Sequence, residues 1–590
     1  MSRFRIRAWK CSSLFHCVAK KVATTRSSRG FARERTWRLH RPRSVVPLHQ
    51  QTVGPVERVL LVLFAAVGFL LLIACANVAN LVLMRSAARA QEMHICLALG
   101  AARGRLLQQT MVESLLLAGL GGILGVALAW LSVATMIRLL PPTFRLPRIE
   151  EVSIDPQVLL FTAALTIGAA ILFGLAPALR SRHMEHAQGL RENSRSVSSP
   201  YRRMRAVMVT AEVALVLPLL VGAGLLAHSF VRLMQVEPGF RAEGLLTVRM
   251  RLLPVRDRAL HAEVVDQILD RVRALPGVTA AGSIGRLPMD GGNSGSWYYR
   301  ADRPEPSPSD RPGGDVSIVS RGYFQAMGIR LLRGRDFDSR DRIGSPHVAI
   351  LNLAAARMLF ADEEPIGKWL RVWWSDAGQV EIVGVAADIR HSQLRTKPDP
   401  CLFMPNAQQP FPFAALVIRT PGNPRAVAGA VKDQLRQVDS DQGVAQVETM
   451  EQLVADSIAQ SKAQTVLIGL FAALALSLAC IGIYGVLAYS VAQRTREIGV
   501  RLALGASPAR TFRLILGEGL GLTGTGMGIG LLLSLALTRF LRDLLYEVEP
   551  LDPAVLTGVV TLLTLVATTA CLLPALRATR VDPAVVLRDE

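Results

Sequence analysis

The sequence predicts a polytopic α-helical membrane protein of about seven transmembrane helices with one extracytoplasmic α/β domain. Three observations predict this fold class. The 590 residues are 51% hydrophobic, and their mean hydropathy is +0.33. Apolar runs of about 20 residues, the length that a helix needs to cross a bilayer, recur along the chain. One long polar region separates two groups of these runs, and its composition is that of a soluble domain.

Seven apolar segments are long enough to span a membrane. They are Val59–Leu83, Met111–Trp130, Val158–Leu179, Val207–Ala227, Val466–Tyr489, Leu514–Leu537 and Val555–Leu576. The second is rich in glycine, at Gly119, Gly121, Gly122 and Gly125, which predicts close helix packing. Placing the arginine-rich short connections in the cytoplasm puts the polar region outside, but it also puts the basic residues 1–50 outside, against the positive-inside rule.

Polar side chains inside the spans predict contacts between helices. Asn77 and Asn80 lie near the end of the first span, and we expect them to form interhelical hydrogen bonds rather than a ligand site. Glu212 lies one to two turns inside the fourth span. We expect it to pair with a neighbouring helix, and a proton relay is the alternative.

The net charge of +21 does not indicate a nucleic-acid partner, because the basic residues are unevenly distributed. Residues 1–50 contain ten arginines and three lysines against one acid, Glu34. Elsewhere basic residues flank apolar runs and lack the interleaved aromatic residues of a nucleic-acid surface. We interpret residues 1–50 as a basic, disordered or non-native segment, and a targeting peptide is the alternative.

The polar region, residues 229–460, is long enough for its own core, in one lobe or two. Its patterns predict helices at Glu263–Leu275 and Pro424–Val438 and buried strands at Val348–Asn352, Val380–Val385 and Ala415–Thr420. Cys401 is the only one of the seven cysteines in this region, so no internal disulfide is predicted there.

A polar stretch between the fifth and sixth spans predicts a short surface helix followed by a tight corner. It covers Arg494–Arg513 and reads R-T-R-E-I-G-V-R-L-A-L-G-A-S-P-A-R-T-F-R. Its apolar face comprises Val491, Thr495, Ile498 and Leu502, and its polar face comprises Arg494, Glu497 and Arg501. Gly505 is expected to end this helix, and Ser507-Pro508 to begin the next.

The same motif occurs about 405 residues earlier. Arg89, Glu92 and Gly100 match Arg494, Glu497 and Gly505, so the chain contains a long internal repeat. The earlier copy has Gln91 and Cys96 where the later one has arginines, so we expect it to couple less well.

These motifs resemble those of FtsX-like permeases of the MacB type, and of the duplicated orphan permeases in particular. The resemblance rests on the two copies of the loop, on the matching endings Pro177–Arg180 and Pro574–Arg577, and on three phrases of the polar region, Tyr323–Phe337, Glu364–Lys368 and Val383–His391. It implies one extracytoplasmic α/β MacB-like core domain. The first half lacks the family's leading span and core domain, so we interpret the chain as truncated at its N-terminus.

The resemblance also implies six segments. They are residues 1–50 as the basic N-terminus, 51–180 as a first FtsX-like three-helix unit, 181–206 as a cytoplasmic basic linker, 207–228 as a transmembrane helix, 229–460 as the periplasmic MacB-like core domain and 461–590 as a second FtsX-like unit.

The function that the resemblance implies is that of a permease subunit of an ABC-type transporter in the bacterial inner membrane. It would transmit ATP-driven motion from a separate cytoplasmic ATPase to the periplasmic domain for export or extrusion. The ATPase-coupling residues would be Arg494, Glu497, Ile498, Arg501, Leu502 and Gly505, with Arg89, Glu92 and Gly100 in the earlier copy. The alternatives are an FtsX-like non-transporting regulator of an extracytoplasmic partner, or an inactive truncated member. A helix that merely lies on the lipid is the alternative for the loop itself.

The motifs predict no enzyme activity in this chain. It has no G-x-x-x-x-G-K-[ST] phosphate loop, and His183 and His186 lack the spacing of a metalloprotease helix. We therefore expect no catalytic, cofactor-binding or metal-ligating residues. Beyond the ATPase, the expected partners are membrane lipids, a second permease subunit or a second copy of the chain, and a periplasmic protein.

Overall fold

The computed structural model of the protein describes residues 48–88, 103–139, 155–164, 166–168, 171, 199–251, 258–291, 295–361, 363–373, 378–411, 413–438, 444–504 and 507–579. The chain divides into two units, Met1–Glu57 and Arg58–Glu590. The second unit contains the helical bundle and the sheet domain.

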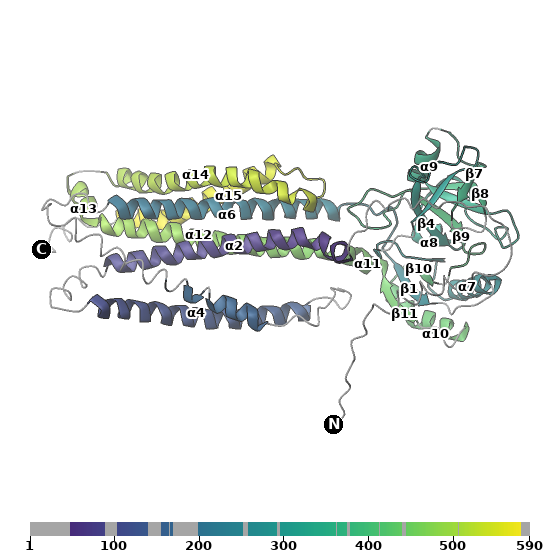
Figure 1. Ribbon diagram of the computed structural model, residues 1–590, viewed down its shortest axis with the longest axis horizontal. Helices are drawn as coiled ribbons and strands as arrows, with labels where there is room; N and C mark the ends of the chain where they lie inside the picture. Colours follow the sequence, from purple (N-terminus) through teal and green to yellow (C-terminus); the bar gives the residue numbers. More distant parts are fainter. Residues whose placement is uncertain are drawn as a thin grey trace, which may run out of the picture. The chain divides into compact units, whose positions relative to one another are not determined.

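Six helices in the described residues are long and apolar enough to cross a membrane. They are α2 (Leu48–Ala88), α4 (Arg103–Leu139), α6 (Ser199–Met234), α12 (Ala459–Gln493), α14 (Pro508–Leu541) and α15 (Pro553–Thr579) (Figure 1). They correspond to six of the seven predicted spans. The third predicted span, Val158–Leu179, is described only in part, where a shorter apolar helix covers Pro156–Gly168.

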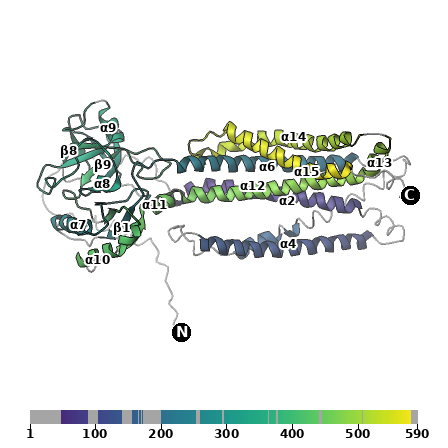
Figure 2. The ribbon, with the colours of Figure 1, turned by 180° about the vertical axis from the view of Figure 1, so that it is seen from behind.

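Helix α6 packs against α12, α14 and α15, and it is the most buried of the spans (Figures 1 and 2). Val213, Val216, Leu217 and Leu225 of α6 are completely inaccessible. A helix that is apolar on all sides is expected at the centre of a bundle, since none of its faces needs contact with water.

Two glycines allow α14 to approach α6 closely. A Cβ atom on Gly526 would lie 2.8 Å from the Thr210 carbonyl oxygen, and one on Gly530 would lie 2.9 Å from the Ala214 carbonyl oxygen. Lipid tails are as apolar as the side chains, so close packing of this kind is a main source of helix association in a membrane.

The glycines of α4, in contrast, do not pack closely against the rest of the described chain. A Cβ atom on Gly119, Gly121 or Gly125 would meet no described atom within 4 Å, and one on Gly122 would meet only Thr166 Cγ2, at 3.6 Å. The large apolar side chains of α4 are exposed as well, among them Ile123 at 69%. The described residues provide one ordinary contact for this glycine run, and the close packing predicted for it stays a prediction. The glycine contacts occur in the second half instead.

The polar region folds around an eleven-stranded sheet. Its strands are β1 (Leu245–Arg251), β2 (Ala280–Ile284), β3 (Gly295–Arg300), β4 (Gly313–Val319), β5 (Leu331–Gly334), β6 (Val348–Asn352), β7 (Trp369–Val372), β8 (Gln379–Ala386), β9 (Cys401–Pro405), β10 (Phe413–Arg419) and β11 (Val444–Thr449). Its helices are α7 (Arg258–Arg273), α8 (Tyr323–Met327), α9 (Leu353–Phe360), the 3₁₀ helix η3 (Pro424–Val427), α10 (Ala428–Val438) and α11 (Met450–Ser457). The predicted strands and helices of this region are confirmed, with ends that differ by a few residues.

The sheet has a closed part and an open part. Strands β4, β3, β7, β8, β6 and β9 pair in that order, and β9 pairs back to β4 in parallel, so these six close into a ring. Strands β2, β10, β1 and β11 continue from β4 as an open sheet, which α7 and α10 cover. Separate clusters of buried residues fill the ring and the space under the two helices.

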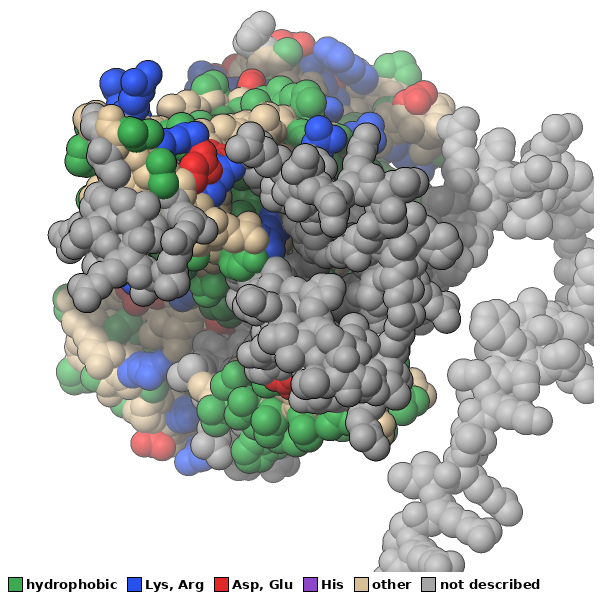
Figure 3. All heavy atoms as spheres, turned by 90° about the vertical axis from the view of Figure 1, so that its left-hand side faces the viewer, with side chains coloured by type: hydrophobic (Ala, Val, Ile, Leu, Met, Phe, Trp, Pro, Cys, Tyr) green, Lys and Arg blue, Asp and Glu red, His purple; other side chains and the backbone are tan. Residues whose placement is uncertain are grey.

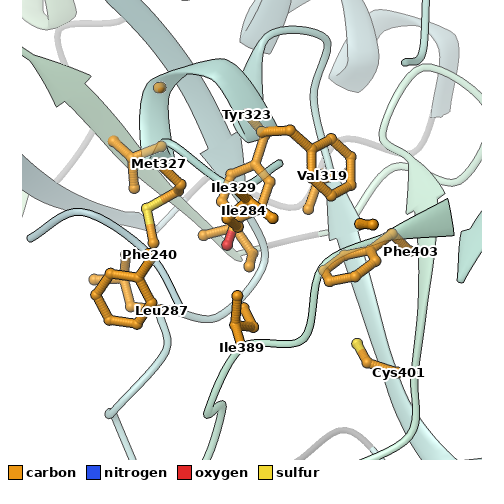
Figure 4. Close-up of a cluster of buried hydrophobic side chains, with 14 of the residues drawn as sticks. Phe240, Ile284, Leu287, Val319, Tyr323, Met327, Ile329, Ile389, Cys401 and Phe403 are labelled. Atoms are coloured by element: carbon orange, nitrogen blue, oxygen red, sulfur yellow. The ribbon is translucent and has the colours of Figure 1, made fainter. Parts of the chain in front are cut away.

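A third buried cluster connects the sheet to the ends of two membrane helices. Figure 4 shows its centre, where Tyr323, Phe403 and Ile389 point toward one another. The rings of Phe324 and Phe403 meet edge to face, with their centroids 5.1 Å apart. Leu233 at the end of α6 and Tyr546, which follows the short 3₁₀ helix η4 (Arg542–Leu544), belong to the same cluster. The ends of α6 and α14 are therefore anchored in the core of the sheet domain.

Helix α12 is joined to the sheet domain without an intervening loop. Ile458 is both the last cap residue of α11 and the first cap residue of α12. Thr449, at the end of β11, begins α11 with a capping box, in which its hydroxyl accepts from the Gln452 amide and the Gln452 side chain accepts from the Thr449 amide. Strand β11 and helices α11 and α12 thus form one connected element.

We expect Gly530→Ala to destabilise the bundle. The added methyl group would press on the Ala214 carbonyl, and overpacking of this kind costs roughly 1–3 kcal/mol. Thermal unfolding in lipid nanodiscs should show a lower midpoint than that of the unsubstituted protein. Gly528→Ala is the matched control, because its Cβ would meet nothing within 4 Å and alanine favours a helix. Equal midpoints for the two variants would contradict the close contact.

Beside the closed ring lies a buried group of polar side chains. Ser317 Oγ is 3.0 Å from His391 Nε2, and the Cys401 thiol donates to Ser317 Oγ at 3.8 Å. All three side chains are buried, and burial lowers the pKa of His391 to about 4. A neutral histidine beside a serine has the parts of a nucleophilic site, but neither side chain is open to a substrate.

Nearby, Asp315 is only 3% exposed, and burial together with the neighbouring Asp399 raises its pKa to about 6.

We expect Asp315 to make the sheet domain less stable as the pH rises. Its pKa is about 6 in the folded protein and 3.8 ordinarily, so the folded state binds the proton more tightly. The stabilisation is complete below pH 3.8 and is lost as the pH rises through 6. Asp315→Asn should therefore raise the unfolding temperature at pH 7.5 more than at pH 4.5, measured by tryptophan fluorescence. His391 is present in both proteins, so its opposite pH dependence cancels in the difference. A difference that does not change with pH would contradict this assignment.

Candidate functional site

A short helix connects the two long helices α12 and α14 at the end of the bundle. Helix α12 ends at Gln493, where the Arg494 amide bonds to the Val491 carbonyl at 3.1 Å. Helix α13 follows directly as Thr495–Ala503. The Thr495 hydroxyl lies within hydrogen-bond distance of the Val491 and Ala492 carbonyls and adds a side-chain bond at the end of α12. The predicted surface helix is therefore confirmed.

The buried face of α13 holds it against α14 and α15. Ile498 is only 7% exposed, and it belongs to a small cluster with Val491, Ile515, Ala575 and Ala578. Val491 and Ile498 confirm two members of the predicted apolar face. Thr495 is half-buried, and the side chain of Leu502 lies outside the described part of the chain.

The exposed face of α13 carries the predicted ion pair. The Arg501 guanidinium donates to Glu497 Oε1 one helical turn away, and the two side chains are 54% and 52% exposed. A pair this exposed contributes only about 0.3–0.5 kcal/mol to stability. Its position on an open face therefore makes it available for contact with another protein.

Arg494 is less exposed than Glu497 and Arg501, with which the sequence pattern grouped it. Its guanidinium instead forms an ion pair with Glu518 of α14 at 3.1 Å, where both side chains are about two-thirds buried. The pair fixes the start of α13 to α14 across the corner. Glu518 occupies the position in the later repeat that Glu113 occupies in the earlier one, and this match is a sequence signal for the position but does not name its partner.

A pocket of about 370 Å³ lies between α12, α13 and α14. Its charged lining comprises Arg494, Glu497, Arg501, Arg510 and Glu518, and its apolar lining includes Leu487, Val491, Ile498 and Ile515. Figure 3 views the molecule from the side on which α13 lies in Figure 1, where basic and acidic side chains lie next to hydrophobic ones. Arg510 and Glu518 were not among the predicted coupling residues, which all precede the following helix, α14.

Two exposed apolar residues extend the outer face of α13. Leu504 is 83% exposed and Val500 is 38% exposed, and both lie close to Glu497 and Arg501 in the sequence. Exposed leucine beside a charged pair is a common composition for a protein-binding surface.

The remaining predicted positions cannot be compared with the structure. Gly505 lies outside the described residues, as do Arg89, Glu92 and Gly100 of the earlier repeat. Ser507 takes the extended backbone conformation of a helix cap with Pro508 at the first helical position, as predicted, but its side chain makes no capping bond.

Comparison with known families identifies both halves of this architecture. The model of the FtsX-like permease C-terminal region matches twice, at residues 64–186 and 469–583, and the model of the MacB-like periplasmic core domain matches residues 215–455. The chain belongs to the FtsX-like, MacB-type family of ABC transporter permeases. The two FtsX matches also confirm the internal repeat, and the permease is a multi-pass protein of the bacterial inner membrane.

Two curated relatives agree with this family assignment, and one solved structure shows a weaker likeness. The permease is 26% identical over 281 residues to the uncharacterized ABC transporter permease YknZ of Bacillus subtilis, an alignment that covers 47% of this chain and 70% of YknZ. It is 26% identical over 439 residues to the macrolide export ATP-binding/permease protein MacB of Azoarcus sp., covering 69% of this chain and 61% of MacB. The periplasmic region of MacB from Actinobacillus actinomycetemcomitans matches with 12% identity and a TM-score of 0.27, covering 39% of this chain and 98% of that structure.

The family assignment also indicates on which side of the membrane α13 lies. The MacB-like domain is periplasmic, and α12 begins beside it at Ala459. The 35 residues of α12 extend over about 50 Å, which exceeds the roughly 30 Å of the hydrocarbon core. The far end of α12, and α13 with it, therefore lies on the cytoplasmic side of the permease.

We expect Glu518→Gln to loosen α13. Loss of the ion pair with Arg494 should cost roughly 1 kcal/mol and speed amide hydrogen exchange in α13 about fivefold. Mass spectrometry of a peptide covering residues 494–504 in nanodiscs measures this rate. Glu497→Gln is the matched control: it removes the more exposed pair with Arg501, and it should leave the rate nearly unchanged. Equal rates for the two variants would show that the Arg494–Glu518 pair does not hold α13.

Proposed function

We propose that the permease receives ATP-driven motion from a separate ABC ATPase at α13 and transmits it to the periplasmic domain for export or extrusion. The observation that carries this proposal is the way α13 is held. Its inner face is buried around Ile498, Arg494 is paired with Glu518, and its outer face presents Glu497, Arg501 and Leu504.

A coupling element has to be rigid, because a loose helix would absorb motion instead of passing it on. Buried contacts to α14 and α15 meet this requirement on one side of α13. On the other side, an ion pair with an adjoining apolar residue offers both registration and burial to a partner. This combination favours a protein partner over the alternative of a helix lying on lipid, whose apolar face would point toward the membrane and not toward α14.

Two routes connect α13 with the periplasmic domain. Helix α12 leads from Arg494 through Ile458 to α11 and the edge strand β11. Helix α14 leads to Leu544 and Tyr546, where Arg395 of the domain donates to the Leu544 carbonyl and Tyr546 enters the domain core. Movement of α13 along either helix would therefore reach the sheet.

The ATPase is expected to be a separate subunit. By its name, the MacB relative of Azoarcus sp. combines ATP-binding and permease functions, and 61% of that protein aligns with this chain. The family models that match this chain are those of the FtsX-like permease region and of the MacB-like core domain. An FtsX-like regulator that transports nothing would use the same coupling site, so the coupling can be tested before the substrate is known.

We expect the double variant Glu497→Ala/Arg501→Ala to bind its ATPase at least about tenfold more weakly, a loss of about 1.4 kcal/mol. The measurement is the affinity of a purified, co-expressed ABC ATPase for the permease in nanodiscs, together with the ATPase rate that the permease stimulates. Leu504→Asp should act in the same direction.

The matched control for this experiment is Asp433→Ala/Arg436→Ala. It removes a similarly exposed ion pair one turn apart, on α10 of the periplasmic domain. The control should leave ATPase affinity unchanged. If the variants at Glu497 and Arg501 also bind and stimulate the ATPase like the unsubstituted permease, α13 is not the coupling site.

A further inference from the structure

Three helices meet inside the membrane at a buried amide and a buried carboxyl group. Asn77 lies on α2, which belongs to the first FtsX-like match, and Glu212 lies on α6. Glu212 is completely inaccessible and Asn77 is 7% exposed. The expected pairing of Glu212 with a neighbouring helix is confirmed, because Asn77 Nδ2 donates to Glu212 Oε1.

The orientation of the Asn77 amide is fixed by a second bond. Asn77 Nδ2 also donates to the Leu478 carbonyl of α12 at 3.0 Å. A carbonyl only accepts, so the nitrogen of the amide must face Leu478. Both N–H groups of Asn77 are then used, and its oxygen, Oδ1, is the part left to accept a hydrogen bond.

Gly482 of α12 supplies the floor of the site. A Cβ atom there would overlap Glu212 Oε2 and would lie 2.7 Å from Asn77 Oδ1. The second carboxyl oxygen and the amide oxygen therefore border the same small space, next to a residue of α12 that has no side chain to fill it. In the ionised form, Glu212 Oε2 can only accept a hydrogen bond, and no described group donates one to it.

Two acceptor oxygens that face one another without a hydrogen between them repel. A carboxylate buried in a bilayer without a cation is also very costly, and no cation pairs with Glu212 among the described residues. One proton on Oε2 removes both costs. We propose that Glu212 is protonated in the membrane and forms a cyclic acid–amide pair with Asn77, in which Nδ2–H donates to Oε1 and Oε2–H donates to Oδ1.

The pair would act as a proton-dependent connection between the two halves of the permease. It joins α2 of the first FtsX-like unit to α6, and the remaining N–H of Asn77 joins both to α12. Loss of the proton would replace an O–H···O bond with two facing acceptors and would separate α2 from α6. This inference is independent of the proposed ATPase coupling, since it rests on different residues, which lie inside the bundle and not on α13.

Infrared difference spectroscopy tests the protonation state directly. The full chain in lipid nanodiscs is compared with Glu212→Gln at pH 8, where Asp315, with its pKa of about 6, is ionised in both proteins. We expect the difference spectrum to show the loss of one C=O stretching band of a protonated carboxylic acid, which shifts in D₂O. Loss of carboxylate bands alone would overturn the proposal.

Substitutions test the two-bond geometry. Glutamine can repeat both bonds, since its oxygen accepts from Asn77 and its N–H donates to Oδ1, so Glu212→Gln should keep the unfolding temperature close to that of the unsubstituted protein. Glu212→Leu and Asn77→Leu should each lower it. A loss with Glu212→Gln as large as that with Glu212→Leu would show that the ionised form is required, against the proposal.

A pair of glycine variants tests the site's floor. Gly482→Ala should lower the unfolding temperature and weaken the carboxylic acid band, because its methyl group would enter the space between the two oxygens. Gly469→Ala, on the same helix, meets nothing within 4 Å and is the matched control. Identical spectra and stabilities for the two variants would contradict the geometry. Should Gly482→Ala fail to fold, the comparison with Glu212→Gln still decides the protonation state.

Discussion

Close contact between α6 and α14 is the constraint on which the bundle depends. A membrane removes the hydrophobic driving force between apolar helices, so their association has to come from fitted surfaces and from polar bonds. Gly526 and Gly530 supply the fitted surface, and the polar bonds lie on the other side of α6, between Glu212 and Asn77. Helix α6 is thereby fixed from two directions. The attachment of α12, α15 and the periplasmic domain follows from its position.

Local patterns were enough to predict much of this fold. Strand β6 was predicted with its observed limits, Val348–Asn352, because it is a short apolar run that ends at Asn352, the residue that caps the next helix. Helix α13 was predicted from its apolar spacing and from the proline that begins the next helix. Such features depend on residues within one or two turns of each other, and that range is what a sequence pattern records.

Contacts between distant segments were not predictable in the same way. The charge pattern placed Arg494 on the outer face of α13, but its partner is 24 residues away, on a helix whose direction the pattern does not contain. The glycines of α4 signalled close packing without naming a partner, and the described part of the chain provides only the contact of Gly122 with Thr166. Glu212 was expected to find a partner on another helix. The structure was needed to show that this partner is Asn77 and that Gly482 borders the pair, because the three residues lie on three different helices.

The proline inside α6 weakens that helix at the point where it contacts α14. Pro218 has no N–H group, so the carbonyl of Ala214, four residues earlier, loses its helical hydrogen bond. That same carbonyl is the atom which Gly530 faces. The bending point of α6 thus lies directly under α14, the helix that begins at the cytoplasmic corner. A small tilt of α14 would therefore act on α6 next to the turn that lacks a helical hydrogen bond, where the helix resists bending least.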